Sequence, residues 1–182
     1  MMRKITLLWP CAAFVVLCTA PTGAQNPNTQ VASGGFFLGL TDAGTATCVN
    51  GDPTEWFPPC TPAAHNSIWR DYDGVMQFVA VDGDAAPFFT GTWVIHGNCN
   101  LDQNLVGACW GTFEGAALGG AWHGTWNGTL DFVRFGGELQ FVGHGTGGGV
   151  EGLHLHLEAA SEGSLNEYAP MLFTARVFSV EE

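Results

Sequence analysis

Apolar and polar side chains alternate with a period of two between residues 122 and 157. In the first part of this stretch the apolar positions are Trp122, Trp126, Leu130 and Phe132, with Gly124 and Gly128 between them. The intervening positions are mostly polar, as at His123 and Asp131. Only an extended strand places these two sets on opposite faces. The pattern therefore predicts an antiparallel sheet that is buried on one side.

Similar short strand patterns recur along the chain, and no segment has the periodicity of a long helix. The predicted strands cover 36–40, 45–49, 75–81, 88–96, 109–115, 121–133, 138–146, 150–159 and 171–180. Short strands separated by glycine-rich turns are typical of closed barrels and sandwiches. We predict an all-β fold, a single antiparallel β-barrel of about eight to nine strands. A β-sandwich is the alternative.

The N-terminus has the features of an export signal. Arg3 and Lys4 precede an apolar run from Ile5 to Leu17, and Thr22-Gly23-Ala24 supplies small residues for cleavage. We predict a signal peptide over 1–24, a flexible leader over 25–34 and one barrel domain over 35–182. The expected location is therefore secreted or periplasmic.

The chain is strongly acidic, and this charge limits its partners. It has 17 acidic residues against five basic ones and a formal net charge of −12. Two of the five cations lie in the predicted signal. Such a surface repels phosphate backbones and anionic headgroups. We expect no nucleic-acid partner and no membrane association after signal cleavage.

Four cysteines remain after the predicted signal is removed: Cys48, Cys60, Cys99 and Cys109. An even number in an exported chain predicts two disulfides. Of the three pairings, the short spacings favour Cys48–Cys60 and Cys99–Cys109. The first would fasten the proline-rich segment 50–67. No C-x-x-C spacing occurs, which argues against a zinc site made by cysteines.

Residues 138–158 are predicted to form a hairpin that turns at Gly147-Gly148-Gly149. This register buries an apolar set, Leu139, Phe141, Leu153, Leu155 and Leu157. It places a polar set on the opposite face, namely Glu138, Gln140, His144, His154, His156 and Glu158.

The three histidines of this hairpin form a candidate metal site. His154 and His156 point the same way along one strand, and His144 is expected diagonally across from them. Imidazoles so placed can bind zinc or copper, with a carboxylate completing the ligand set. A plain solvated face and a groove for a polar ligand are the alternatives.

Six tryptophans follow the signal, and their positions predict different roles. Trp93, Trp122 and Trp126 occupy the strand parity assigned to the core. Trp56 and Trp69 lie in or beside the irregular segment 50–67. Tryptophan stacks on sugar rings and lines apolar pockets, so Trp56 and Trp69 are the candidate ligand-binding residues.

The run Gly143-His144-Gly145-Thr146-Gly147, followed by Gly152-Leu153, resembles the closing hairpin of small bacterial barrels of allene oxide cyclase-like fold. With the glycine-aromatic strands before it, the resemblance covers the C-terminal half. It implies a closed barrel of about eight strands whose interior holds an apolar ligand. It carries over no catalytic residues, and the segment fastened by Cys48 has no counterpart in that family.

The chain contains no G-x-S-x-G and no serine in a recognisable catalytic context. We therefore favour a non-enzymatic exported barrel that binds a small apolar or saccharide ligand or a partner protein, with no cofactor. The alternatives are an isomerase or cyclase using the barrel cavity, and a metal-dependent enzyme at the face of His144, His154 and His156. Pairing of the barrel with copies of itself is left open.

Overall fold

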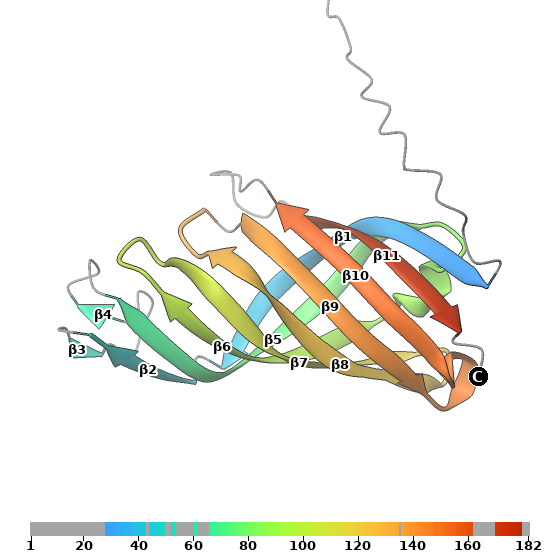
Figure 1. The fold of residues 1–182 in the computed structure, drawn as a ribbon, viewed down its shortest axis with the longest axis horizontal. Coiled ribbons are helices and arrows are strands. Elements are labelled where there is room, and N and C mark those ends of the chain that lie inside the picture. The colour runs from blue at the N-terminus through green and yellow to red at the C-terminus, as the bar shows by residue number, and fades with distance from the viewer. Residues whose placement is uncertain are drawn as a thin grey trace, which may run out of the picture.

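Eight antiparallel strands close into a barrel (Figure 1). The computed structural model describes residues 28–42, 44–49, 52–53, 60–61, 66–134, 136–161 and 170–179. The barrel strands are β1 (Thr29–Asp42), β5 (Ser67–Asp82), β6 (Thr92–Leu101), β7 (Val106–Ala117), β8 (Gly120–Asp131), β9 (Gly136–Thr146), β10 (Leu153–Ser161) and β11 (Met171–Ser179). Each of β5 to β11 pairs with the next, and β1 pairs with both β11 and β5. This confirms the predicted barrel over the sandwich.

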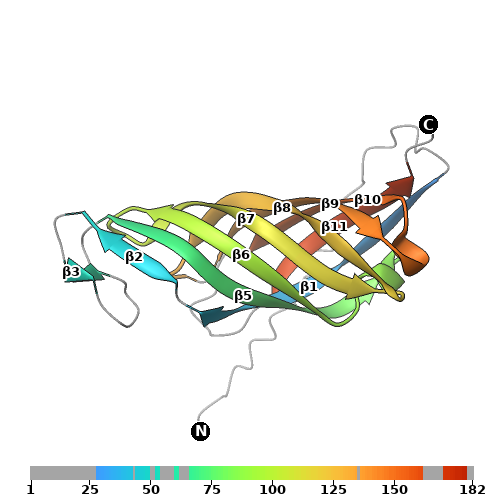
Figure 2. The same cartoon turned by 90° about the horizontal axis from the view of Figure 1, so that it is seen from below.

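Three short strands lie outside the barrel. β2 (Thr45–Cys48) pairs with the start of β5, and β3 (Asp52–Pro53) pairs with β4 (Cys60–Thr61). Figure 2 shows β2 and β3 extending from one end of the barrel. This end carries the segment that was predicted to be an irregular excursion.

The nine predicted strands all have counterparts in the structure, but several boundaries differ. The largest differences are at the starts of three strands, and β5 begins at Ser67 rather than at residue 75. β1 begins at Thr29, so residues 29–34, predicted as part of a flexible leader, pair with β11. Phe88 belongs to a short 3-10 helix, η1 (Ala86–Phe88), and β6 starts only at Thr92. The polar composition of 29–34 hid a strand that pairs along its length with β11 and, at Ser33, also with β5.

The barrel interior alternates large rings with glycines. Trp93, Trp122 and Trp126 are all at most 1% exposed, which confirms their predicted place in the core. Gly115 lies between Trp93 and Trp122 in the strand register. A Cβ on Gly115 would lie 2.2 Å from Cδ1 of Trp93. Glycine on the inner face therefore makes room for the neighbouring rings.

The predicted hairpin forms between β9 and β10, around a second 3-10 helix, η2 (Gly148–Val150). Its apolar residues are buried, except that Leu153 is half-buried against the core. His144 and His154 point outward, as predicted, but they are directly opposed rather than diagonal. The exact register depends on how many residues the turn takes up, which glycine runs leave undetermined.

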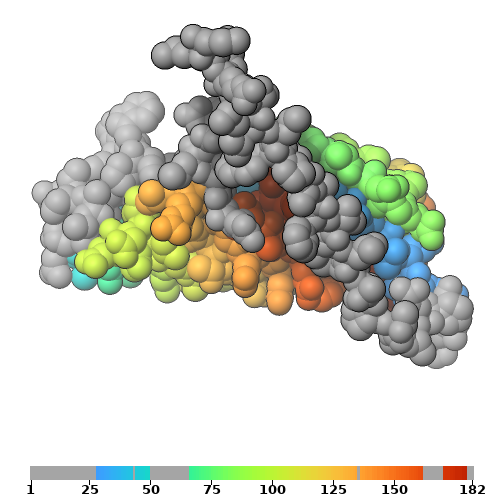
Figure 3. All heavy atoms as spheres, turned by 90° about the horizontal axis from the view of Figure 1, so that it is seen from above, coloured from blue at the N-terminus to red at the C-terminus, as the bar shows by residue number. Residues whose placement is uncertain are grey.

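One end of the barrel is closed by η1. Phe88 and Phe89 are buried there, and the indole nitrogen of Trp122 donates a hydrogen bond to the carbonyl oxygen of Phe88 at 3.3 Å. In the space-filling view of Figure 3 the green residues around η1 lie beside the blue start of β1. The barrel is thus filled with aromatic side chains at this end.

A disulfide joins Cys99 on β6 to Cys109 on β7, at directly opposed positions inside the barrel. This pairing was predicted from the spacing, and it is typical of proteins from oxidising compartments. Cys48 is also disulfide-bonded. Cys60 lies on β4, where the structure describes no side chains, so its pairing with Cys48 stays a prediction.

The predicted signal peptide over 1–24 lies outside the described residues. The described residues contain no helix that is long and apolar enough to span a membrane.

Candidate functional site

A cavity of about 680 Å³ opens at the end of the barrel opposite η1. It lies between the second half of β1, residues 69–77 of β5, Ile95 of β6, the end of β8 and the starts of β9 and β11. Its wall is mostly apolar: the rings of Phe36, Trp69, Tyr72 and Phe132, and the side chains of Ile95, Leu130 and Met171.

A β-bulge in β5 brings two of these rings to the cavity. The register between β5 and β6 shifts between Trp69 and Tyr72, and Asp71 within the bulge has a φ of 56°. A bulge inserts an extra residue and so restores the inward orientation three positions later instead of two. Both side chains are therefore buried, with ring centroids 5.7 Å apart.

The hydroxyl of Tyr72 is the main polar group deep in the cavity. It lies 3.6 Å from Sγ of Cys99, and because a disulfide sulfur carries no hydrogen the hydroxyl must be the donor. Burial raises the pKa of Tyr72 well above its ordinary value, so this group stays neutral. The cavity therefore presents a hydroxyl and no phenolate.

The buried Tyr72 predicts a loss of stability in alkali. The folded state keeps the phenol proton above pH 10, whereas the unfolded chain releases it there, so stability is fully present below about pH 10 and falls as the pH rises. We expect the free energy of unfolding to fall by about 1.4 kcal/mol per pH unit above that point. Denaturant titrations at about pH 9 and about pH 11 check this.

Tyr72→Phe is the control, since it removes the titrating group and should lose less stability in alkali than the wild type. The absorbance of tyrosinate offers a direct measurement, because Tyr168 is the only other tyrosine of the chain. In a Tyr168→Phe background, release of the Tyr72 proton near pH 10 in the folded state would contradict the prediction.

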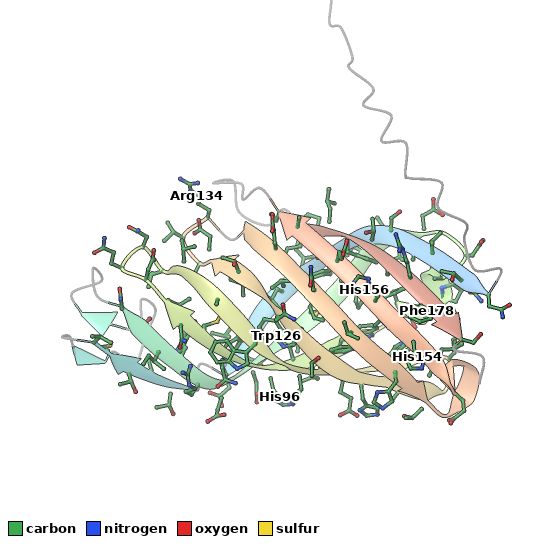
Figure 4. All side chains as sticks on the ribbon, viewed as in Figure 1. His96, Trp126, Arg134, His154, His156 and Phe178 are labelled. Atoms are coloured by element: carbon green, nitrogen blue, oxygen red, sulfur yellow. A yellow bond between two sulfur atoms is a disulfide. The ribbon has the colours of Figure 1, made fainter. Side chains whose placement is uncertain are left out.

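Asp131 is the acidic residue at the cavity edge, and its carboxylate stabilises a turn by accepting backbone hydrogen bonds. Oδ1 accepts hydrogen bonds from the backbone N–H groups of Val133 at 2.9 Å and Arg134 at 2.8 Å. Oδ2 lies 3.9 Å from Nε of Arg134, whose side chain points into solvent (Figure 4). The carboxylate is thus committed to the β8–β9 connection.

The predicted metal residues lie on the outer wall of the barrel, away from the cavity. His156 lies 3.8 Å from the carboxylate of Glu158, and His154 stacks on Phe178 with ring centroids 5.7 Å apart (Figure 4). No three metal-ligating side chains are grouped to hold an ion among the described residues. The register places His144 beside His154 and His156 opposite Val142, and a metal site at the three histidines stays a prediction.

The predicted ligand-binding tryptophans have different outcomes. Trp69 is 3% exposed and lines the cavity. Trp56 lies outside the described residues. Sequence reasoning missed Tyr72, because strict alternation from Trp69 would point it outward, and it missed Ile95 and Leu130 as cavity residues. Their inward parity was readable, but nothing local marks which inward positions border an empty space.

Comparisons with known proteins find no matching family model, no similar curated protein and no similar solved structure. The resemblance to allene oxide cyclase-like barrels is therefore supported only at the level of an eight-stranded antiparallel barrel.

Proposed function

We propose that the protein is an exported binding protein that holds a small apolar ligand in the open end of its barrel. The observation that carries this proposal is the cavity of about 680 Å³, lined by rings and aliphatic side chains. Ligand pockets typically enclose about 300 to 1,000 Å³ and are mostly apolar with a few polar groups. The apolar signal segment and the buried disulfide support export to an oxidising compartment.

The chemistry of the wall favours an apolar ligand over a saccharide. A sugar needs several hydrogen bonds to its hydroxyls, because polar groups buried without partners are costly. The side chains among the lining residues that can hydrogen-bond are those of Tyr72, Gln77, Asp131 and the indole of Trp69. Two of these are already engaged in the fold, Tyr72 by Cys99 and Asp131 by its turn.

The same inventory favours binding over catalysis by an isomerase or cyclase. Proton transfer in such reactions needs a positioned acid or base near the substrate. Among the described lining residues the ionisable groups are Tyr72, held neutral, and Asp131, held by backbone N–H groups. Neither is arranged as a free base facing the cavity.

Binding can be tested with N-phenyl-1-naphthylamine, an uncharged probe whose fluorescence rises in apolar surroundings. We expect saturable binding to the oxidised chain lacking residues 1–24. Leu38→Trp should weaken it about tenfold or more, since Leu38 lines the cavity and a larger ring fills it. Val142→Trp is the matched control, because Val142 is 55% exposed on the outer face of β9.

Equal binding by the two variants would contradict the proposed cavity site. Ile95→Phe provides a second way to fill the cavity, from a residue that is 1% exposed. Saturable binding of an oligosaccharide in the absence of probe binding would instead favour the saccharide alternative.

A further inference from the structure

Four metal-ligating side chains lie in one row across the outer wall of the barrel. Glu114 on β7 is directly opposite His123 on β8. His123 is opposite His144 on β9, and His144 is opposite His154 on β10. Directly opposed residues on one face of a sheet are nearest neighbours across the strands. Four consecutive strands therefore contribute one potential ligand each.

The rings of His123 and His144 lie close enough to share an ion after a small change of side-chain rotamer. Their centroids are 6.2 Å apart, with the ring planes inclined at 38°. A zinc–nitrogen bond is about 2.1 Å and the ligating nitrogen lies about 1.1 Å from the ring centre, so two imidazoles on one tetrahedral ion have centroids about 5.2 Å apart. The observed pair is about 1 Å beyond that separation, a gap that rotation of the two side chains has to close while the backbone stays in place.

The row differs from the site suggested by the spacing of His154 and His156. His156 belongs to the next row, where it is opposite Val142 on one side and Arg176 on the other. A fixed cation beside His156 opposes a divalent ion there. His123, which no local motif marks, replaces it because only the strand register brings β8 beside His144.

The geometry points to a divalent transition-metal site on the outer wall, with His123 and His144 as its two imidazole ligands. Glu114 and His154 flank the pair, and both are exposed, so their side chains can turn toward an ion. Water completes the coordination shell, as is usual where protein ligands are few. Zinc and copper are the ions that imidazole favours, and the net charge of −12 attracts cations generally.

Calorimetric titration of the chain lacking residues 1–24 with ZnCl₂ tests this site. We expect one binding event in the micromolar range. His123→Ala and His144→Ala should each weaken it about tenfold or more, because either change removes one ligand of the His123–His144 pair. His156→Ala is the matched control, because His156 lies on the same face of β10 as His154 but outside the row. It should change the affinity less than about twofold.

Copper provides a second readout that does not depend on affinity. The electron paramagnetic resonance spectrum of bound Cu²⁺ should show nitrogen couplings from two imidazoles in the wild type and from one in His144→Ala. Absence of zinc binding by the folded wild type would overturn the site. So would a His156→Ala variant as impaired as His144→Ala, with both shown folded by circular dichroism. Probe binding in the cavity is a separate measurement, so the two proposals can fail independently.

Discussion

Gly115→Ala should destabilise the protein by about 3 kcal/mol, because the new methyl group meets a ring that cannot move. A Cβ at this position would lie 2.2 Å from Cδ1 and 2.3 Å from Cγ of Trp93. Trp93 is fully buried and stacks on Phe113 with centroids 5.3 Å apart and planes inclined by 7°. It also stacks on Phe89 at 5.7 Å, and Phe78 meets it edge-on at 4.8 Å. The ring is therefore held by three neighbouring rings.

Thermal and denaturant unfolding measure this effect, and the melting temperature should fall by about 10 °C. Gly39→Ala is the matched control, since its Cβ would meet only Val75 Cγ2 at 3.6 Å, an ordinary contact. It should stay within about 0.5 kcal/mol of the wild type.

A double variant tests the cause of the effect. If the clash with Trp93 is responsible, then Trp93→Leu should cost less in the Gly115→Ala background than in the wild type. Equal stability of Gly115→Ala and Gly39→Ala would show that the ring does not pack against Gly115.

The alternation of rings and glycines explains why the strands could be predicted from sequence. Trp122 and Trp126 define one face of β8, and Gly124 and Gly128 share that face without breaking its period. A side-chain period of two is a local property, so it survives without knowledge of the partner strand. The same reasoning found the buried leucines of β10.

The candidate site depends on features that are not local. The bulge after Trp69 turns Tyr72 inward, whereas strict alternation from Trp69 would point it outward. The His123–His144 pair depends on the register between β8 and β9, which their joining segment sets. The cavity depends on the relative lengths of neighbouring strands. β11 begins opposite Phe36, so the part of β1 after Phe36 has no partner on β11. None of these is visible in a single strand.

The Cys99–Cys109 pairing was predictable because close sequence spacing and hairpin formation lead to the same contact. The disulfide joins paired residues on β6 and β7, and both are at most 1% exposed. On β5, the strand that pairs with the other edge of β6, Trp69 is directly opposite Cys99. The Tyr72 hydroxyl contacts Cys99 Sγ. The disulfide thus supports the inner wall of the cavity as well as the hairpin.

Replacing both cysteines by alanine should lower the free energy of unfolding by about 3 kcal/mol, the value expected for a loop of this length in the chain-entropy model. Alanine, unlike serine, leaves no buried hydroxyl. The loss of unfolding free energy therefore reports the missing cross-link and the small cavity left by the sulfur atoms. Denaturant unfolding under oxidising conditions measures it. Because Cys48 is also disulfide-bonded, reductant added to the double variant reports the effect of that second disulfide separately.

The double variant should also weaken binding of N-phenyl-1-naphthylamine, since Trp69 and Tyr72 lose the sulfur atoms against which they pack. The effect on binding should be smaller than that of Leu38→Trp, because the cavity is loosened rather than filled. A double variant as stable as the oxidised wild type would mean that β6 and β7 hold together without the cross-link. The disulfide would then serve neither the barrel nor its cavity, and the open end would have to be kept in shape by the aromatic packing alone.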